Sequence, residues 1–165
     1  MKIRTGFVSN SSTSSFLIAY NPDDFDVCPH CGCSDADPVK MAENSSRSFV
    51  QWTMKPDEIS DWSQDQRETE ARIQKQLEHA QELVVAGVTH MEAGRYSNYR
   101  AEHAVEDFSE ELENHRKHTA LVKDKVAMGK TIASLEIEQH DDYVMETFRK
   151  LLDSGQVELL VEGSY

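Results

Sequence analysis

Two long segments in the middle of the chain carry apolar residues at helical spacing, and they limit what the rest of the chain can fold into. The apolar seam of the first segment consists of Ile59, Trp62, Ile73, Leu77, Ala80 and Val84. The seam of the second consists of Ala101, Val105, Phe108, Leu112, His115, Thr119, Val122 and Val126. The positions between them are mostly charged or amide side chains, which is typical of amphipathic helices with one narrow apolar face. Gly87 and Gly94 separate the segments, so we predict two long helices joined as an antiparallel hairpin.

Polar residues interrupt both seams, with Gln66 in the first and His115 and Thr119 in the second. Polar side chains at such positions either weaken the packing or mark a surface for a partner. Seams this narrow do not stabilise such long helices by themselves, because helices in proteins depend on burial of an apolar face. We therefore expect the sheet, or a second copy of the chain in a homo-oligomer, to cover them.

Short apolar runs toward both ends of the chain predict the strands of a sheet. Residues 16–20, 49–54, 131–137 and 157–161 are rich in branched and aromatic side chains and are bounded by turn formers. Ile3 and the pair Phe7-Val8 indicate a further strand before these. A helix that begins at Asp141 or Asp142 and ends at Gly155 separates the last two strands, and a right-handed parallel crossover is the expected connection.

These patterns predict an α+β fold in a single domain of residues 1–165. We expect a small mixed sheet that takes strands from both ends of the chain, with the helical hairpin projecting from the middle. Residues 1–55 would supply the N-terminal strands and a cysteine-containing loop, and residues 56–129 the hairpin. Residues 130–165 would form a strand–helix–strand unit.

The three cysteines of the chain lie in one short segment, Cys28-Pro29-His30-Cys31-Gly32-Cys33. A Cys-x-x-Cys pair with Pro and Gly inside it resembles a zinc knuckle, in which two thiolates of a tight turn bind one metal ion. Cys33 is a candidate third ligand and His30 a candidate fourth, although Asp35, a distant His or a second subunit would also complete the site. We expect a structural zinc ion, with a redox dithiol or unmetallated cysteines as the rival interpretations.

A hydroxyl-rich stretch, residues 9–15, separates the first two apolar runs and is expected to connect two strands. A polar turn is the simplest interpretation. Ser9, Asn10, Ser11 and Ser12 are also candidates for anion binding or for phosphorylation, although the stretch contains no Lys or Arg. Residues 44–50 repeat the pattern with one residue fewer, by chance or because two hydroxyl loops lie side by side at one edge of the sheet.

The start of the chain resembles the start of a group of uncharacterised bacterial and bacteriophage proteins. The shared residues are Met-Lys-Ile-Arg, then Gly6-Phe7-Val8-Ser9-Asn10-Ser11-Ser12, then a hydroxyl run that ends at Phe16. That run is usually all serine, and Thr13 interrupts it here. The resemblance covers residues 1–20 and carries no activity. It implies a prokaryotic or phage origin and a cytoplasmic setting.

The charge of the chain limits its partners. Its 30 Asp and Glu residues outnumber its 17 Lys and Arg residues, which gives a formal net charge of −13. Direct binding to nucleic-acid phosphates is therefore not expected, and a protein partner with a basic surface is. No segment is long and apolar enough to cross a bilayer, and the N-terminus lacks the apolar core of a signal peptide, so we expect a cytoplasmic protein without a membrane role.

Three functional hypotheses follow. The favoured one is a non-enzymatic phage or bacterial accessory protein that binds another protein through the helical hairpin, with zinc as a structural staple. The first alternative is a metal-dependent hydrolase or nucleotide-processing enzyme that uses the cysteines, or His115 and His118 on one helix. The second is an acidic mimic of DNA that inhibits a nucleic-acid-binding protein.

Overall fold

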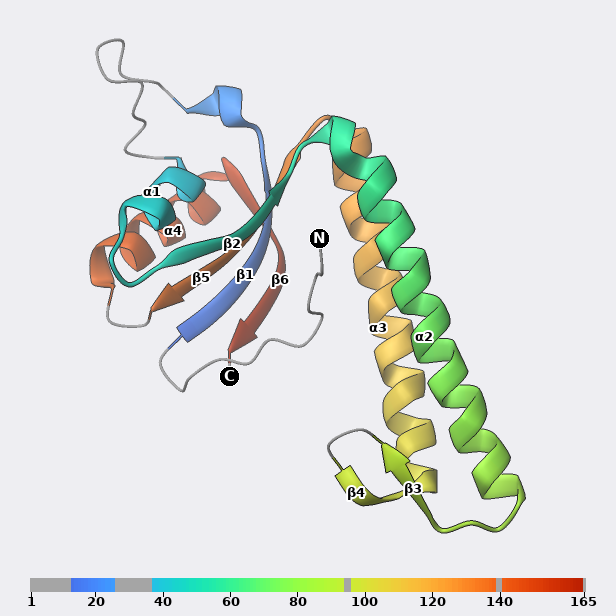
Figure 1. The fold of residues 1–165 in the computed structure, drawn as a ribbon. Coiled ribbons are helices and arrows are strands. Elements are labelled where there is room, and N and C mark those ends of the chain that lie inside the picture. Colours follow the sequence, from blue (N-terminus) through green and yellow to red (C-terminus); the bar gives the residue numbers. More distant parts are fainter. Residues whose placement is uncertain (1–12, 26–36, 94–95, 139–140, 165) are drawn as a thin grey trace. The chain divides into compact units, whose positions relative to one another are not determined.

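The computed structural model describes residues 13–25, 37–93, 96–138 and 141–164, and it shows an α+β fold (Figure 1), which confirms the predicted fold class. The helices are α1 (Pro38–Asn44), α2 (Ile59–Val85), α3 (Ala101–Ala127) and α4 (Asp142–Ser154). The strands are β1 (Thr13–Tyr20), β2 (Phe49–Met54), β3 (His90–Ala93), β4 (Tyr96–Arg100), β5 (Thr131–Glu138) and β6 (Val157–Ser164). The chain forms two compact units. We call Met1–Ile59 with Leu121–Tyr165 the sheet unit, and Ser60–Ala120 the helical unit.

The sheet of the first unit has the strand order β2-β5-β1-β6, with strands from both ends of the chain as predicted. β1 pairs antiparallel with both β5 and β6, and β2 pairs antiparallel with β5. The two strands on either side of α4 therefore run parallel to each other, but β1 lies between them. The sheet is antiparallel at every described pairing and not mixed, because β1 occupies the gap in the strand–helix–strand unit.

Part of the hydroxyl-rich stretch is strand and not loop. β1 begins at Thr13, and Ser14 and Ser15 pair with β5 on one side and with β6 on the other. Ladder hydrogen bonds on both sides override the turn preference of these residues, which makes the prediction of a loop through residue 15 wrong at these positions. Ser15 is 2% exposed, and its hydroxyl has no hydrogen-bond partner among the described residues.

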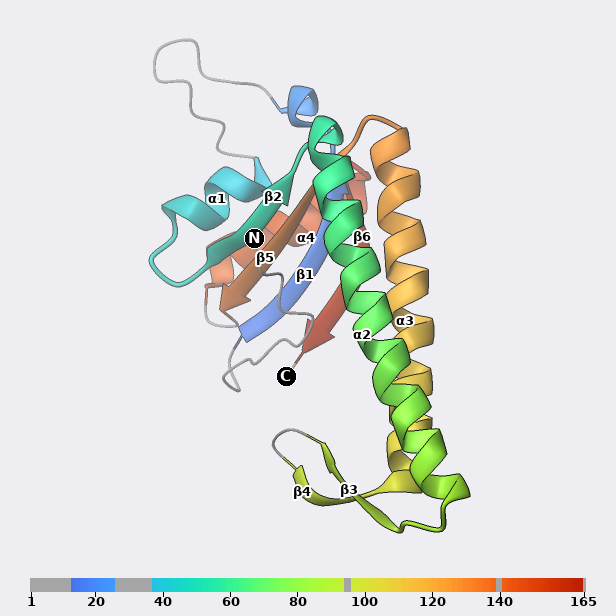
Figure 2. The ribbon, with the colours of Figure 1, turned by 45° about the vertical axis from the view of Figure 1, so that its right-hand side comes forward.

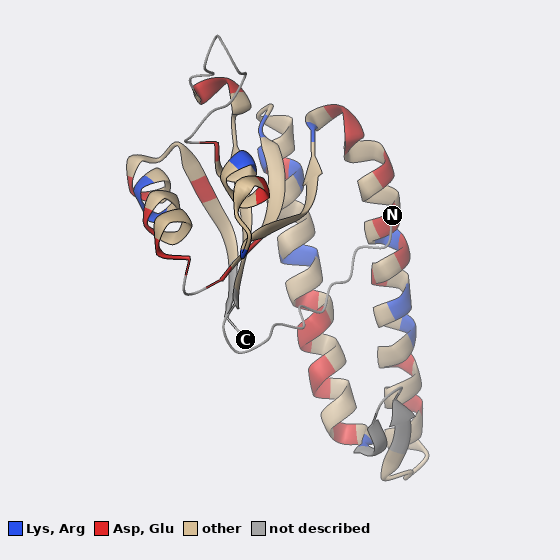
Figure 3. Cartoon of the chain, turned by 60° about the vertical axis from the view of Figure 1, so that its left-hand side comes forward, with Lys and Arg blue, Asp and Glu red and all other residues tan. Residues whose placement is uncertain are grey.

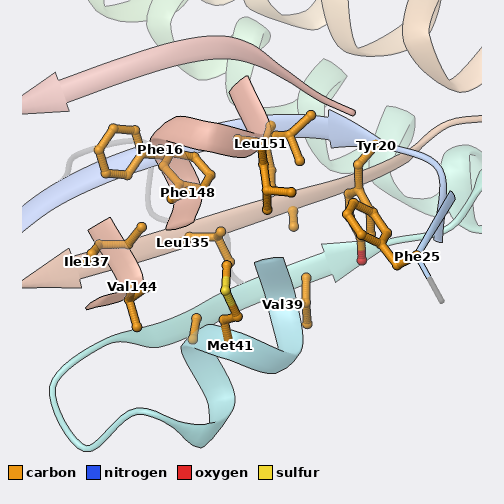
Figure 4. Packing of buried hydrophobic residues seen from close by; sticks show 14 residues of the cluster. Phe16, Tyr20, Phe25, Val39, Met41, Leu135, Ile137, Val144, Phe148 and Leu151 are labelled. Atoms are coloured by element: carbon orange, nitrogen blue, oxygen red, sulfur yellow. The ribbon is translucent and has the colours of Figure 1, made fainter. Parts of the chain in front are cut away.

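The core of the sheet unit lies between one face of the sheet and the helices α1 and α4. Figure 4 shows side chains from β1, β5, α1 and α4 pointing toward one another. The ring of Phe148 in α4 lies 4.8 Å, centroid to centroid, from that of Phe16 in β1. α4 begins after the N-cap Asp141 and ends at Gly155, whose φ of 75° is left-handed, so both predicted ends are confirmed. α1, which was not predicted, packs Val39 and Met41 into the same core.

The predicted helical hairpin is present in the second unit. Figure 2 shows α2 and α3 running side by side in opposite directions. Ile73 and Leu77 of α2 pack against Leu112 of α3, and Ala80 packs against Ala104. Burial along the seams therefore follows the predicted spacing, and these residues form the apolar contact between the two helices.

The end of the hairpin differs from the prediction. An antiparallel ribbon of β3 and β4 follows α2, where only a turn was expected. α2 ends in a Schellman motif: the N–H of Val88 donates to the carbonyl of Leu83 at 2.9 Å, and that of Gly87 to the carbonyl of Val84 at 3.0 Å. Gly87 has a φ of 73°, which suits glycine best. Val84 lies in this last turn and is 38% exposed, so it is not part of the buried seam.

Candidate functional site

The residues predicted for zinc and anion binding lie outside the described ranges. Cys28, His30, Cys31 and Cys33 fall within residues 26–36, and Ser9, Asn10, Ser11 and Ser12 fall within residues 1–12. These assignments therefore stay predictions.

The described residues on either side of the cysteine segment belong to the core of the sheet unit. Phe25, just before it, is buried, and its ring centroid lies 6.0 Å from that of Tyr20. Asp37, just after it, is also buried, and its Oδ1 accepts hydrogen bonds from the N–H groups of Val39 and Lys40. Burial, followed by the nearby carboxylates of Asp37 and Glu43, raises the pKa of Tyr20. The cysteine segment thus starts and finishes at fixed, buried residues.

A polar cluster joins the second hydroxyl loop to the start of α4. The hydroxyl of Ser45 donates to Asp141 Oδ2, and the hydroxyl of Ser48 donates to the same oxygen at 2.9 Å. Asp141 Oδ1 accepts from the N–H of Val144 at 3.5 Å, as expected of an N-cap. Ser45 Oγ also accepts from the N–H groups of Arg47 and Ser48. We call Ser45, Ser48 and Asp141 the Asp141 cluster; it holds the α1–β2 connection against α4.

The electrostatics of the Asp141 cluster favour a structural role. Partial burial raises the pKa of Asp141, but the hydrogen bonds from Ser45, Ser48 and Val144 and the charge of Arg47 outweigh it, so the net pKa is below 3.8. A carboxylate with a lowered pKa is a weak general base at neutral pH. Ser45 Oγ also accepts hydrogen bonds from two backbone N–H groups, and these bonds hold its side chain within the α1–β2 connection.

The sequence predicted Asp141 as a cap but missed its partners. Ser45 and Ser48 lie 96 and 93 residues away in the chain, so no local pattern connects them to Asp141. The available signal was the repeat of the hydroxyl pattern at residues 44–50. The hydroxyls of Ser45 and Ser48 in that segment do form hydrogen bonds, with the N-cap residue of α4.

A polar layer crosses the helical hairpin at the predicted interruptions of the seams. His115 is 8% exposed and Gln66 is 7% exposed, and His115 Nε2 lies 3.1 Å from the backbone oxygen of Gln66. The two polar interruptions therefore meet each other. Burial, then the charges of His115 and Lys117, lowers the pKa of the neighbouring His118. Within the described ranges, no group of three or more His, Cys, Asp or Glu side chains is arranged to hold a metal ion.

An ion-pair triad ties the end of α3 to β6 within the sheet unit. Lys125 Nζ lies 2.6 Å from Glu158 Oε1, and Lys130 Nζ lies 3.5 Å from Glu158 Oε2. The hydrogen bond from Lys125 is the main reason that the pKa of Glu158 is lowered, and it also raises the pKa of Lys125. These contacts fix the point at which the chain returns to the sheet unit after α3.

The first half of α3 forms an acidic surface. Residues 101–115 contain no Lys or Arg, and all of their acidic side chains are exposed: Glu102, Glu106, Asp107, Glu110, Glu111 and Glu113. Figure 3 shows acidic positions along the N-terminal half of α3. The first cations after them are already paired, Arg116 with Glu70 and Lys117 with Glu113, both at 2.6 Å. The surface therefore carries a large excess of negative charge.

The described part of the chain includes no helix that is both long and apolar enough to cross a membrane. No protein family, curated protein or solved structure was found to match this chain.

Proposed function

We propose that this chain is a non-enzymatic accessory protein, of a bacterium or bacteriophage and acting in the cytoplasm, that binds a protein partner through its helical unit. The partner presents a basic surface. The observation that carries the proposal is the row of six exposed carboxylates on residues 102–113 of α3.

The acidic surface disfavours folding of α3, which supports a role in binding. Glu102 and Glu106, Glu106 and Glu110, and Asp107 and Glu111 are like-charge pairs four residues apart on one helix. Each such pair destabilises a helix by about 0.2–0.5 kcal/mol. Only Glu102 lies in the first turn, where the helix dipole favours an acid. A surface that served stability alone would alternate acids with bases, as the pair Glu113 and Lys117 does.

A charge-matched pair of variants tests the contact surface. The helical-unit variant carries Glu106→Gln, Glu110→Gln and Glu111→Gln, and the sheet-unit control carries Glu43→Gln, Asp57→Asn and Asp153→Asn. Both remove three exposed charges. Binding of a fluorescent lysine-rich peptide, followed by anisotropy at about 0.15 M salt, should weaken about tenfold in the helical-unit variant. The control should bind like the unmodified chain. Equal weakening in both variants would contradict the proposal, because binding would then depend on the net charge of the chain and not on this surface.

We also propose that Cys28, Cys31, Cys33 and His30 hold a structural zinc ion. The support is the spacing of these residues in the sequence, together with the buried residues Phe25 and Asp37 on either side. Elemental analysis of purified protein should find about one zinc per chain, which Cys28→Ser and Cys31→Ser should each remove. Half a zinc per chain in a dimer would place the site between subunits. Protein with no metal and an unchanged fold would contradict the proposal.

A second candidate function, mimicry of nucleic acid, is favoured by the charge spacing on α3. Apart from Glu113, which pairs with Lys117, five carboxylates over residues 102–111 give about one charge per 3 Å of helix axis. One strand of duplex DNA carries about one per 3.4 Å. Competition against labelled duplex DNA for a basic DNA-binding protein tests this function. Displacement that weakens with added salt, and that the helical-unit variant loses, would support it, and no displacement at low salt would rule it out.

A further inference from the structure

The tip of the helical hairpin exposes a cluster of valines. The described part of the chain has seven large exposed apolar residues, and Val84, Val85 and Val88 are three of them. The other four, Phe49, Met128, Tyr143 and Leu159, belong to the sheet unit, on different elements or turns. Val85 is 89% exposed although it belongs to a helix, where Gln or Lys would be favoured on a solvated face. Scattered apolar residues are normal on a surface, whereas a cluster indicates a contact site.

A small pocket opens beside these valines. Its volume is about 100 Å³, and it is lined by Val84, Gly87, Val88, Thr89, Arg100 and Glu102. An engineered apolar cavity of about 150 Å³ accepts benzene, so this pocket has room for about one aliphatic side chain. Its walls come from the Schellman turn of α2 and the start of α3. The hydrogen bond from the N–H of Ala101 to the carbonyl of Thr89, at 3.1 Å, connects these two parts.

Carboxylates dominate the charge around the tip. Residues 76–90 and 100–113 contain eight Asp and Glu but a single Lys or Arg, which is Arg100. Glu82 and Glu102 are exposed, and they lie close in sequence to Val84 and Arg100 respectively. An apolar side chain that enters the pocket would therefore bring the residues next to it into a negative field.

We propose that the valines and the pocket at the hairpin tip bind an apolar side chain that lies between Lys or Arg residues in a basic polypeptide. This inference rests on the proposed function and names the contact within it. The valines and the pocket supply the apolar contact, and the carboxylates on α2 and α3 attract the cations on either side. The arrangement follows the general pattern of an interface, with an apolar centre and a charged rim.

Charge argues against a second copy of the chain as the occupant. Each copy carries a formal net charge of −13. Of the cations nearest the acidic surface, Arg116 and Lys117 are already paired within the chain, and so are Lys125 and Lys130 near the other end of α3. Two acidic tips would repel each other, as would a tip and an anionic membrane or nucleic acid. A basic polypeptide meets no such repulsion.

Two peptides and four variants test the proposal on the full chain. The probes are a fluorescent lysine-rich peptide with one central leucine and the same peptide with glycine in its place. Val84→Gln removes a valine that lines the pocket, at a helical position where Gln is favoured, and Glu102→Gln removes a pocket carboxylate. Met128→Gln is the matched control, since Met128 is 62% exposed and precedes the left-handed Gly129 at the end of α3. The helical-unit variant with its three Gln substitutions is included.

The leucine peptide should bind about tenfold more tightly than the glycine peptide, as expected for burial of one aliphatic side chain. Val84→Gln should abolish most of that difference, because Val84 lines the pocket. Glu102→Gln should weaken both peptides about twofold, and Met128→Gln should change neither. Equal binding of the two peptides to the unmodified chain would overturn the tip contact. If the helical-unit variant still lost affinity in that case, the proposed function would stand. A mass that doubles with concentration and returns to that of a monomer in Val84→Gln would instead identify a second copy as the occupant and overturn the proposal.

Discussion

The sheet unit surrounds its buried residues on several sides, whereas the helical unit buries a single row of them. Fourteen buried residues from strands and helices form the core of the sheet unit. Among the described residues of the helical unit, two apolar clusters contain five buried residues, three of them large, and Trp62 and Ala101 are buried besides. The sheet unit also adds long-range polar contacts, with the Asp141 cluster at one helix start and the triad of Lys125, Lys130 and Glu158 at the end of another.

Because of this difference, the two units have different roles: the sheet unit stabilises the protein, and the helical unit provides the contact surface. A residue in the sheet core touches several elements, so its loss is felt throughout that unit. The exposed faces of α2 and α3 are rich in charged side chains, and on the first half of α3 these charges do not favour folding. The comparison therefore assigns the stability of the protein mainly to the sheet unit and partner binding to the helical unit.

The largest loss is expected from Phe148→Ala. Phe148 is 1% exposed and its ring contacts that of Phe16 across the core. The truncation leaves a cavity and should lower the free energy of unfolding by about 3–5 kcal/mol, measured by chemical denaturation. Tyr143→Ala in the same helix is the control, because Tyr143 is 68% exposed and should change little. A small loss in Phe148→Ala would show that the sheet core is not the main source of stability.

Ile73→Ala should destabilise the helical unit and leave the sheet unit intact. Ile73 is 1% exposed and packs between α2 and α3. We expect a loss of about 2–4 kcal/mol, with faster amide hydrogen exchange confined to the helical unit. Val85→Ala, at an exposed position of the same helix, should leave exchange unchanged. Equal acceleration in the strands of the sheet unit would mean that the two units unfold as one.

Asp141→Asn should cost less, about 1–2 kcal/mol at neutral pH, because it weakens a cap and two hydrogen bonds to a charged group. The pKa of Asp141 is below 3.8 in the folded chain, so its stabilising effect is present above that value. It is lost as the pH falls through the folded pKa. Thermal unfolding of both forms should therefore converge at low pH. A difference that persists in acid would show that the charge of Asp141 is not its source.

Protonation of His118 should make the stability of the helical unit depend on pH, less strongly than Asp141 does for the sheet unit. Its pKa is lowered from 6.5, mainly by burial, so the folded chain binds a proton less readily than the unfolded chain. Stability should be full above pH 6.5 and should fall as the pH drops from there through the folded pKa. His118→Gln should remove this slope in the thermal midpoint. His118 is itself exposed, so His79→Gln at another exposed helical position serves as the matched control, and an unchanged slope in His118→Gln would contradict the assignment.

The sequence was sufficient for those elements that depend on local pattern. The spacing of Ile73 and Leu77 predicted the buried seam, and Asp141 and Gly155 predicted the ends of α4. It was insufficient where the structure of a segment depends on residues that are far away in the sequence. The insertion of β1 between β5 and β6, the strand conformation of Ser14 and Ser15, and the hydrogen bonds from Ser45 and Ser48 all depend on residues about a hundred positions away.

Two missed elements did carry local signals. Asp37 followed by Pro38 is a cap followed by a favoured first helical residue, and it begins α1. Tyr96 and Tyr99, which were not assigned to a strand, belong to a residue type that favours the strand β4 in which they lie. Of the three valines at the tip, only Val84 belonged to the predicted seam, as its last member. Their exposure follows from the turn at Gly87, whose direction the sequence does not specify.

The most direct test of this division of roles is the free energy of unfolding of the variant with Glu106→Gln, Glu110→Gln and Glu111→Gln. If these carboxylates serve binding, their removal relieves like-charge repulsion on α3, and the variant should be as stable as the unmodified chain or more stable by about 0.2–1 kcal/mol. A loss of more than about 1 kcal/mol would contradict the account, because it would show that the acidic surface stabilises the fold.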